Sequence, residues 1–131
     1  MIENRYQKER MVLVLDKGTI DGFDYCIVCL GTHPVAYVRL PKNNKYHGIN
    51  YQDIEDIGCH WGLSFSDDDL GFNPMVVEDS WWIGWDYAHC EDWCGYMDEA
   101  KNLEFGNKKW TTKEILKGIK KVIKQLNKVN E

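Results

Sequence analysis

The sequence predicts an α+β domain in which a mostly antiparallel sheet carries a short mid-chain helix and a long C-terminal amphipathic helix. Two observations favour this class: runs of β-forming residues separated by turn signals, and a helical apolar period near the C-terminus. No stretch has the composition of a linker, so we expect a single domain over residues 1–131. Apolar residues make up 44% of the chain, which is enough for a hydrophobic core.

β-Forming residues define five predicted strands, namely 11–15, 23–30, 35–40, 59–65 and 80–87. Gly31-Thr32-His33-Pro34 separates the second from the third, which predicts a β-hairpin. Asp16-Lys17-Gly18 is a turn signal that should end the first strand.

Two helices are expected outside the sheet. Tyr51, Ile54 and Ile57 recur at helical spacing before Gly58, which predicts a short helix with a glycine end. The C-terminal helix should begin at the capping-box pair Thr111 and Glu114. Its apolar stripe recurs every three or four residues and comprises Ile115, Ile119, Val122, Leu126 and Val129. Docking of this stripe on the sheet is the leading interpretation, and binding to a membrane surface through the basic face is the alternative.

Charge is distributed unevenly along the chain. The net charge is −5, yet positions 46–100 hold thirteen acidic residues and no lysine or arginine, whereas positions 107–131 hold eight lysines and two glutamates. The acidic span argues against direct nucleic-acid binding, which needs clustered basic residues. It leaves open a cation site, a basic protein partner, mimicry of nucleic-acid charge, or a solvated acidic surface.

Cellular location and redox state follow from simple counts. No apolar run approaches the roughly 20 residues that span a bilayer, and no signal-peptide pattern is present, so we expect a cytoplasmic protein. Five cysteines without framework spacing predict free thiols. A homodimer is possible, but no feature of the sequence specifies it.

The segment 59–65 carries the first candidate site. As a strand, it would place His60, Gly62 and Ser64 on one face and Trp61 on the other. Gly62 would leave room for a ligand beside His60. The structural alternative is a hydrogen-bonded histidine in a partly polar sheet face.

The densest polar pattern follows the fifth predicted strand. Asp86, His89 and Asp92 recur every three residues directly after the aromatic residue Trp85. Two carboxylates and an imidazole can bind a divalent cation, move protons or recognise hydroxyl and amide groups. The structural alternative is a network that only closes the loop.

These two stretches resemble a family of small uncharacterised proteins from bacteriophages and prophages. The family pattern joins a His-Gly-Gly-Leu-Thr motif, here His60 to Ser64, to a Gly-Phe-Asp-Cys-x-His-x-x-Asp motif, here Gly84 to Asp92. The resemblance covers about Phe23 to Leu126. Trp61 replaces a glycine, Ser64 a threonine, Trp85 a phenylalanine and Tyr87 a cysteine. The resemblance implies a phage or prophage accessory protein in the bacterial cytoplasm, of a kind that often counters host defence.

Three functions compete at this point. The first is binding of a small, polar, nucleotide-like ligand, with aromatic rings stacking on a base. The residues expected to bind that ligand are His60, Trp61, Ser64, Trp85, Asp86, His89 and Asp92. The second is metal-dependent hydrolysis of phosphodiesters, with a divalent ion on His60, Asp86, His89 and Asp92. The third is inhibition of a host defence protein through the acidic surface.

Overall fold

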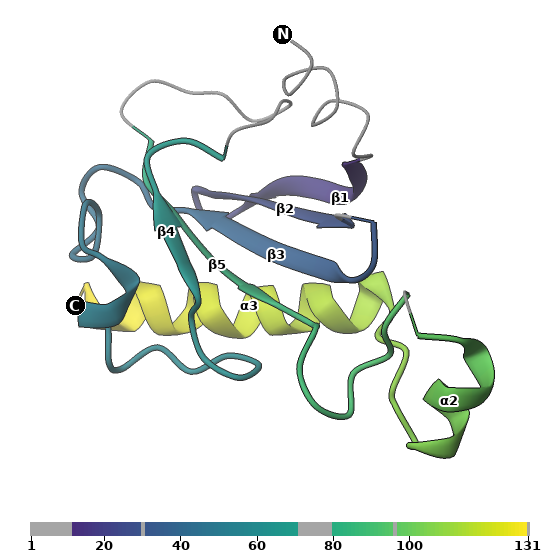
Figure 1. The fold of residues 1–131 in the computed structure, drawn as a ribbon. Coiled ribbons are helices and arrows are strands. Elements are labelled where there is room, and N and C mark those ends of the chain that lie inside the picture. The colour runs from purple at the N-terminus through teal and green to yellow at the C-terminus, as the bar shows by residue number, and fades with distance from the viewer. Residues whose placement is uncertain (1–11, 30, 71–79, 96, 131) are drawn as a thin grey trace, which may run out of the picture.

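The protein is a five-stranded antiparallel sheet with one long helix packed along one of its faces, as the computed structural model shows (Figure 1). The structure describes residues 12–29, 31–70, 80–95 and 97–130. The strands lie in the order β1-β2-β3-β5-β4. Their bounds are β1 Leu13–Ile20, β2 Phe23–Cys29, β3 Pro34–Arg39, β4 Phe65–Asp67 and β5 Trp82–Asp86. The helices are the 3₁₀ turn η1 Tyr51–Asp53, α2 Glu99–Glu104 and α3 Thr112–Val129. The predicted α+β class is confirmed.

The first strand is longer than predicted. β1 continues through Asp16-Lys17-Gly18, so the turn predicted there is wrong. Gly18 is needed by the pairing itself, because a Cβ at this position would lie 3.0 Å from the ring of Tyr25 on β2. The hairpin turns instead at Asp21 and Gly22, whose φ angles of 51° and 82° suit the Asp-Gly pairs of tight hairpins.

The central strands follow the prediction closely. β2 and β3 form the expected hairpin, and β5 then pairs with β3. Gly84 makes this third pairing possible, because a Cβ there would lie 2.7 Å from the ring of Tyr37. On the face away from α3, Cys26, Val28 and Trp82 are almost completely buried. Burial raises the pKa of the Cys26 thiol to about 12.

Of the two elements predicted between β3 and β5, the strand 59–65 is wrong, and the short mid-chain helix is present as a single 3₁₀ turn. Residues 59–64 do not form a strand, since a turn closes from the Gly62 N–H to the Cys59 carbonyl at 3.0 Å and only Phe65–Asp67 joins the sheet. The predicted mid-chain helix is reduced to η1, although Ile54 and Ile57 are buried as their spacing suggests. The spacing of Ile54 and Ile57 therefore predicts their burial correctly, but the helix inferred from that spacing ends earlier than expected.

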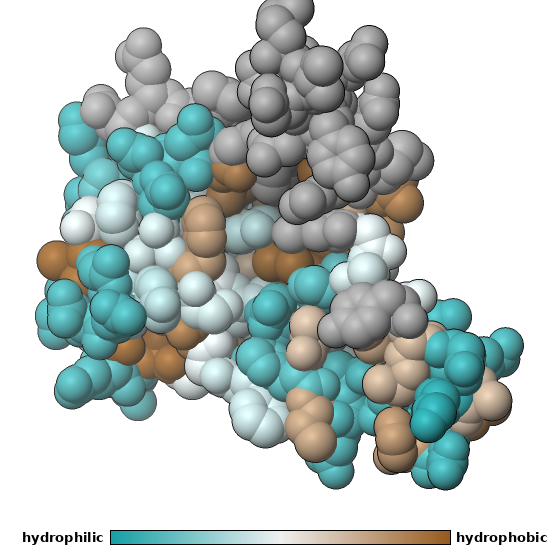
Figure 2. Space-filling view, viewed as in Figure 1, coloured by the Kyte–Doolittle hydropathy of each residue, from teal (hydrophilic) through white to brown (hydrophobic). Residues whose placement is uncertain are grey.

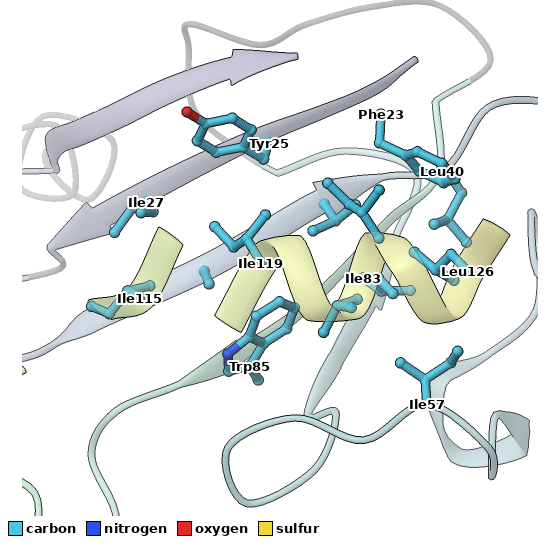
Figure 3. Close-up of a cluster of buried hydrophobic side chains, with 14 of the residues drawn as sticks. Phe23, Tyr25, Ile27, Leu40, Ile57, Ile83, Trp85, Ile115, Ile119 and Leu126 are labelled. Atoms are coloured by element: carbon cyan, nitrogen blue, oxygen red, sulfur yellow. The ribbon is translucent and has the colours of Figure 1, made fainter. Parts of the chain in front are cut away.

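The main core lies between the sheet and α3. Figure 3 shows Ile115, Ile119 and Leu126 of the helix facing Ile83 and Trp85 of the sheet. All five of these side chains are 0% exposed. Thr111 and Glu114 form the predicted capping box at the start of α3. The C-terminal helix is thus confirmed in its position, its buried stripe and its first turn.

A second region leaves the sheet after β5 and returns before α3. We call residues 88–95 and 97–109 the α2 lobe, and Figure 1 shows it extending beyond the end of the sheet. The lobe is closed where the Lys108 N–H donates to the Glu91 carbonyl at 2.7 Å and the Trp93 N–H donates to the Lys108 carbonyl at 2.8 Å. In Figure 2 its surface mixes hydrophobic with hydrophilic side chains. The exposed hydrophobic residues there include Leu103 and Phe105.

The interior of the α2 lobe is organised by one polar side chain. Asn102 is 0% exposed, and its amide donates to the carbonyls of Cys94, Met97 and Asp98 at 2.9 to 3.2 Å. Its Oδ1 accepts from the Cys94 N–H and from the Asn107 side-chain amide, both at 3.0 Å. This part of the chain therefore gains its order from hydrogen bonds rather than from apolar packing.

Among the described residues, no helix combines the length and the apolar character needed to cross a membrane.

Candidate functional site

The candidate site forms where three segments meet beside the start of α3. The turn at Cys59–Gly62 contributes His60 and Trp61, and the end of β5 contributes the segment 86–92. Trp110, just before the Thr111 cap, completes the group. Segments more than thirty positions apart in the sequence therefore meet, as the contact between His60 and Asp92 shows.

Asp92 is the buried centre of this arrangement. Its side chain is only 3% exposed and accepts from three different donors. The Nε2 of His60 lies 3.0 and 2.9 Å from its two carboxylate oxygens, the Trp110 Nε1 donates at 2.8 Å, and the His89 backbone N–H donates at 3.0 Å. A carboxylate with this many donors fixes its neighbours in place, so Asp92 positions His60.

The state of the His60 ring follows from this pairing. An ionised carboxylate only accepts hydrogen bonds, so the Nε2 of His60 carries the proton that points at Asp92. In the described part of the chain no residue hydrogen-bonds to its Nδ1. The ring is stacked on Tyr87 with a centroid distance of 4.6 Å and packs edge-on against Trp110 at 4.9 Å. His60 is thus a rigid, oriented imidazole with one nitrogen left to accept a proton or a hydrogen bond.

A second histidine–carboxylate pair lies beside the first. The Nε2 of His89 is 2.6 Å from the Oδ1 of Asp86, and the Nε2 of His33 is 3.9 Å from the other oxygen. Although the first distance is short, neither Asp86 Oδ1 nor His89 Nε2 has a hydrogen bond of acceptable geometry within the described residues. We interpret the contact as an electrostatic pair between two atoms that are buried against each other. The three side chains are 21 to 31% exposed, so their other atoms remain partly accessible to a ligand.

Trp61 is the most exposed aromatic side chain of the group. It is 62% exposed and stacks on His89 with a centroid distance of 5.0 Å and an interplanar angle of 17°. Its backbone φ is 60°, at a turn position that normally selects glycine. A tryptophan held in this region is strained by about 1–3 kcal/mol. Glu91, at φ 75°, is a second such residue beside the same site.

Burial keeps the groups behind the site neutral. It raises the pKa of the Cys59 thiol to about 12, and it raises the pKa of the Tyr87 hydroxyl above its usual value. Neither group therefore supplies a thiolate or phenolate at neutral pH. The Tyr87 hydroxyl accepts instead from the Nε1 of Trp85 at 3.1 Å.

An open pocket of about 590 Å³ continues from His89 into the α2 lobe. Its lining combines acidic, sulfur-containing and aromatic residues, including Glu91, Cys94, Met97 and Phe105. A ligand stacked at the histidine end would therefore have space to extend along the lobe.

The structure brings together most of the residues predicted for the site but not all of them. His60, Trp61, Asp86, His89 and Asp92 form one connected group. Trp85 is 0% exposed and packs against α3, so it belongs to the core rather than to the ligand site. Ser64 is exposed, its backbone N–H donates to the Gly84 carbonyl at 2.9 Å, and among the described residues its side chain has no hydrogen bond to either histidine pair.

The four residues predicted as metal ligands are divided between two pairs. His60 pairs with Asp92, and His89 pairs with Asp86, with the two imidazole centroids 6.0 Å apart. Within residues 12–29, 31–70, 80–95 and 97–130, no three histidine, cysteine, aspartate or glutamate side chains are arranged to hold a metal ion. All five cysteines are free thiols, as expected.

Four contributors were missed at the sequence level. His33 comes from the β2–β3 turn, and Tyr87 supplies the stacking surface for His60. Trp110 closes the site from the helix side, and the ammonium of Lys108 lies 4.0 Å from the centre of its ring. Only Tyr87 and Trp110 carried any signal in the sequence, since Tyr87 lies within the motif Gly84 to Asp92 and Trp110 directly precedes the helix cap Thr111.

Comparison with known proteins gives no match: no protein-family model fits the chain, and no curated protein or solved structure is significantly similar to it. The resemblance to phage and prophage proteins therefore stays a prediction.

Proposed function

We propose that the protein binds a small polar ligand with a planar ring, of nucleotide-like chemistry, at the site formed by Trp61, His89, Asp86 and His60. The observation that carries this proposal is the exposed Trp61 ring, held at φ 60° and stacked on His89. A large exposed aromatic side chain on strained backbone has an energetic cost that folding alone does not explain.

The family pattern sharpens the point. Members of the resembling family have glycine at this position, and glycine is the residue that a positive φ favours. This chain therefore keeps the strained turn while adding a side chain that the turn disfavours. Gain of a stacking surface for a ligand accounts for that substitution, because stacking of a base on an aromatic ring contributes about 1–3 kcal/mol.

The polar groups around Trp61 suit hydrogen-bond recognition. The free Nδ1 of His60 can accept from a ligand N–H or O–H, since Asp92 fixes the proton on Nε2. The Asp86 Oδ1 and the His89 Nε2 are buried against each other, so ligand contacts from this pair would come from the remaining polar atoms of the two side chains, which are 31% and 30% exposed. A base edge or a ribose hydroxyl offers donors and acceptors of the matching kinds.

Phosphate contacts would come from Lys108 rather than from Arg39. Arg39 is already paired with Asp24 on β2 at 3.0 Å. Lys108 pairs with Glu114 at 2.8 Å, but half of its side chain is exposed and its ammonium lies over Trp110 at the rim of the site. One cation supports binding of a ligand with few phosphate groups.

The resemblance also implies a cellular setting in which binding of a nucleotide-like ligand would be useful. In a phage or prophage accessory protein, a stacking site of this kind would sequester a nucleotide-derived defence signal in the bacterial cytoplasm. We propose counter-defence on that basis, and it depends on the resemblance, whereas the binding proposal depends on the site.

The test compares binding and stability in Trp61→Gly. Nucleoside monophosphates, ADP-ribose and cyclic dinucleotides would be titrated into each protein by calorimetry, and unfolding would be followed in urea. We expect at least one nucleotide to bind the wild type and Trp61→Gly to bind it roughly ten-fold or more weakly. The variant should nevertheless be as stable as the wild type or more stable, because glycine relieves the strain.

Leu103→Ala is the matched control, since Leu103 is 65% exposed on α2 and lies outside the stacked group. It should leave both quantities unchanged. If no nucleotide binds the wild type, or if Trp61→Gly loses stability without any effect on binding, the site is a structural network and the proposal is wrong.

A further inference from the structure

The outer face of α3 carries a stripe of lysines that the candidate site does not use. The stripe comprises Lys113, Lys117, Lys120, Lys121, Lys124 and Lys128. At about 100° per residue these six positions fall within an arc of roughly 100° along about 22 Å of helix. All six are exposed.

No acidic side chain neutralises this lysine stripe. Glu114 is the one acidic residue of α3, and it is engaged by Lys108 and by the capping box. Among the described residues, no carboxylate forms an ion pair with any of the six lysines. Six lysines and one glutamate give the helix a charge of +5, so the rest of the chain carries −10 within the total of −5.

The lysine stripe destabilises α3 itself. Neighbouring lysines are repeatedly three or four residues apart, as in the sets 113–117–121 and 120–124–128. Like charges at these spacings repel each other and destabilise a helix. Folding on the sheet needs only the opposite, apolar face of α3, so the concentration of positive charge on the outer face requires a separate reason.

We propose that this lysine stripe contacts the sugar-phosphate backbone of a nucleic acid without reading its sequence. A linear row of ammonium groups matches a linear row of phosphates, and their contact releases counterions. Lysine is a flexible point charge, and α3 has no arginine to read base edges and no aromatic ring for base stacking. Contact is therefore electrostatic and independent of sequence.

An anionic membrane fits the helix less well. Helices that bind membranes insert their apolar face among the lipids. Here that face is taken up by the core, with Ile115, Ile119, Val122 and Leu126 all 0% exposed. The lysines alone would have to hold the protein at the surface.

The expectation of no direct nucleic-acid contact came from the acidic span 46–100, and the contact proposed here departs from it. Screening limits exposed charges to interactions within about 8 Å at physiological salt. A locally uniform stripe can therefore attract phosphates even though the chain as a whole is acidic. The inference is independent of the proposed ligand site.

The test is the salt dependence of binding to a DNA duplex of about 20 base pairs, which is longer than the stripe. By fluorescence anisotropy, log K of the wild type should fall with log salt concentration with a slope of about −4 to −5. Lys120→Gln/Lys124→Gln should bind roughly ten-fold more weakly at about 50 mM salt and reduce the slope by about 2.

Lys17→Gln/Lys101→Gln removes the same charge from β1 and α2, and it should bind as the wild type does. Circular dichroism would establish that both variants are folded. Equal losses in the two double variants would overturn the proposal, because affinity would then follow net charge alone. Absence of binding at low salt, or tighter binding to phosphatidylserine vesicles than to the duplex, would overturn it as well.

Discussion

The core beneath α3 and the α2 lobe are held together by different forces. Between the sheet and α3, apolar side chains such as Ile119 and Trp85 are removed completely from water. In the α2 lobe, Asn102 occupies the corresponding central place and makes five hydrogen bonds. Burial of apolar side chains is strongly stabilising and does not depend on their orientation. A buried amide, in contrast, stabilises only the arrangement in which its hydrogen bonds are all made. The site lies where these two regions join.

The largest effect should come from the core. Ile119→Ala removes a side chain that is 0% exposed between α3 and the sheet, and we expect it to lower the free energy of unfolding by about 2–5 kcal/mol. The control is Asn127→Ala on the exposed face of the same helix, which should change stability by less than about 0.5 kcal/mol. Urea unfolding measures both. Similar values for the two variants would mean that α3 is not the main cover of the sheet.

The same contrast explains what could be predicted from the sequence. The positions of β2, β3, β5 and α3 were predicted because apolar periods and a capping box are local signals. His60, Asp86, His89 and Asp92 of the candidate site were predicted as well, because they are clustered within two short motifs. In both cases the information lies within a few residues.

What could not be predicted depends on contacts distant in sequence or on backbone conformation. Trp110 and His33 join the site only through tertiary packing. The alternation in 59–65 suggested a strand, but positive φ angles at Trp61 and Gly62 turn the chain there. Trp85 is predicted to bind the ligand by stacking on a base, yet alternation along β5 points its ring into the core.

A smaller and local effect is expected in the α2 lobe. Asn102→Ala leaves the buried Cys94 N–H and the carbonyls of Cys94, Met97 and Asp98 without their side-chain partner. We expect the free energy of local opening to fall by about 1–3 kcal/mol. Hydrogen exchange at the Cys94 amide should therefore accelerate, while the amides of β3 stay protected. Asn107→Ala is the control, since it removes a single donor to Asn102.

If Asn102→Ala instead accelerates exchange throughout β3, the α2 lobe and the core unfold together. The two regions would then differ in the interactions that stabilise them but would unfold as one cooperative unit. A purely local response would mean that the pocket beside His89 can open without loss of the fold.

The smallest effect concerns the link between the two regions. Lys108 of the α2 lobe and the Thr111 backbone N–H both contact the carboxylate of Glu114 in the first turn of α3, at 2.8 and 3.0 Å. These contacts lower the pKa of Glu114 to about 2, with Lys108 as the largest cause. A lowered folded-state pKa means that the stabilisation is fully present above the usual value of 4.5 and is lost as pH falls toward about 2.

Glu114→Gln should therefore be less stable than the wild type at neutral pH, and the difference should shrink as pH is lowered from about 5 to about 2. Denaturant unfolding at several pH values measures this convergence, and Glu55→Gln, an exposed acid outside the helix, is the charge-matched control. Lys108→Gln should reproduce part of the loss and reduce its pH dependence, because Lys108 is the main cause of the lowered pKa. If Glu114→Gln differs from the wild type by the same amount at every pH, its carboxylate acts as a neutral cap and does not join the α2 lobe to α3 electrostatically.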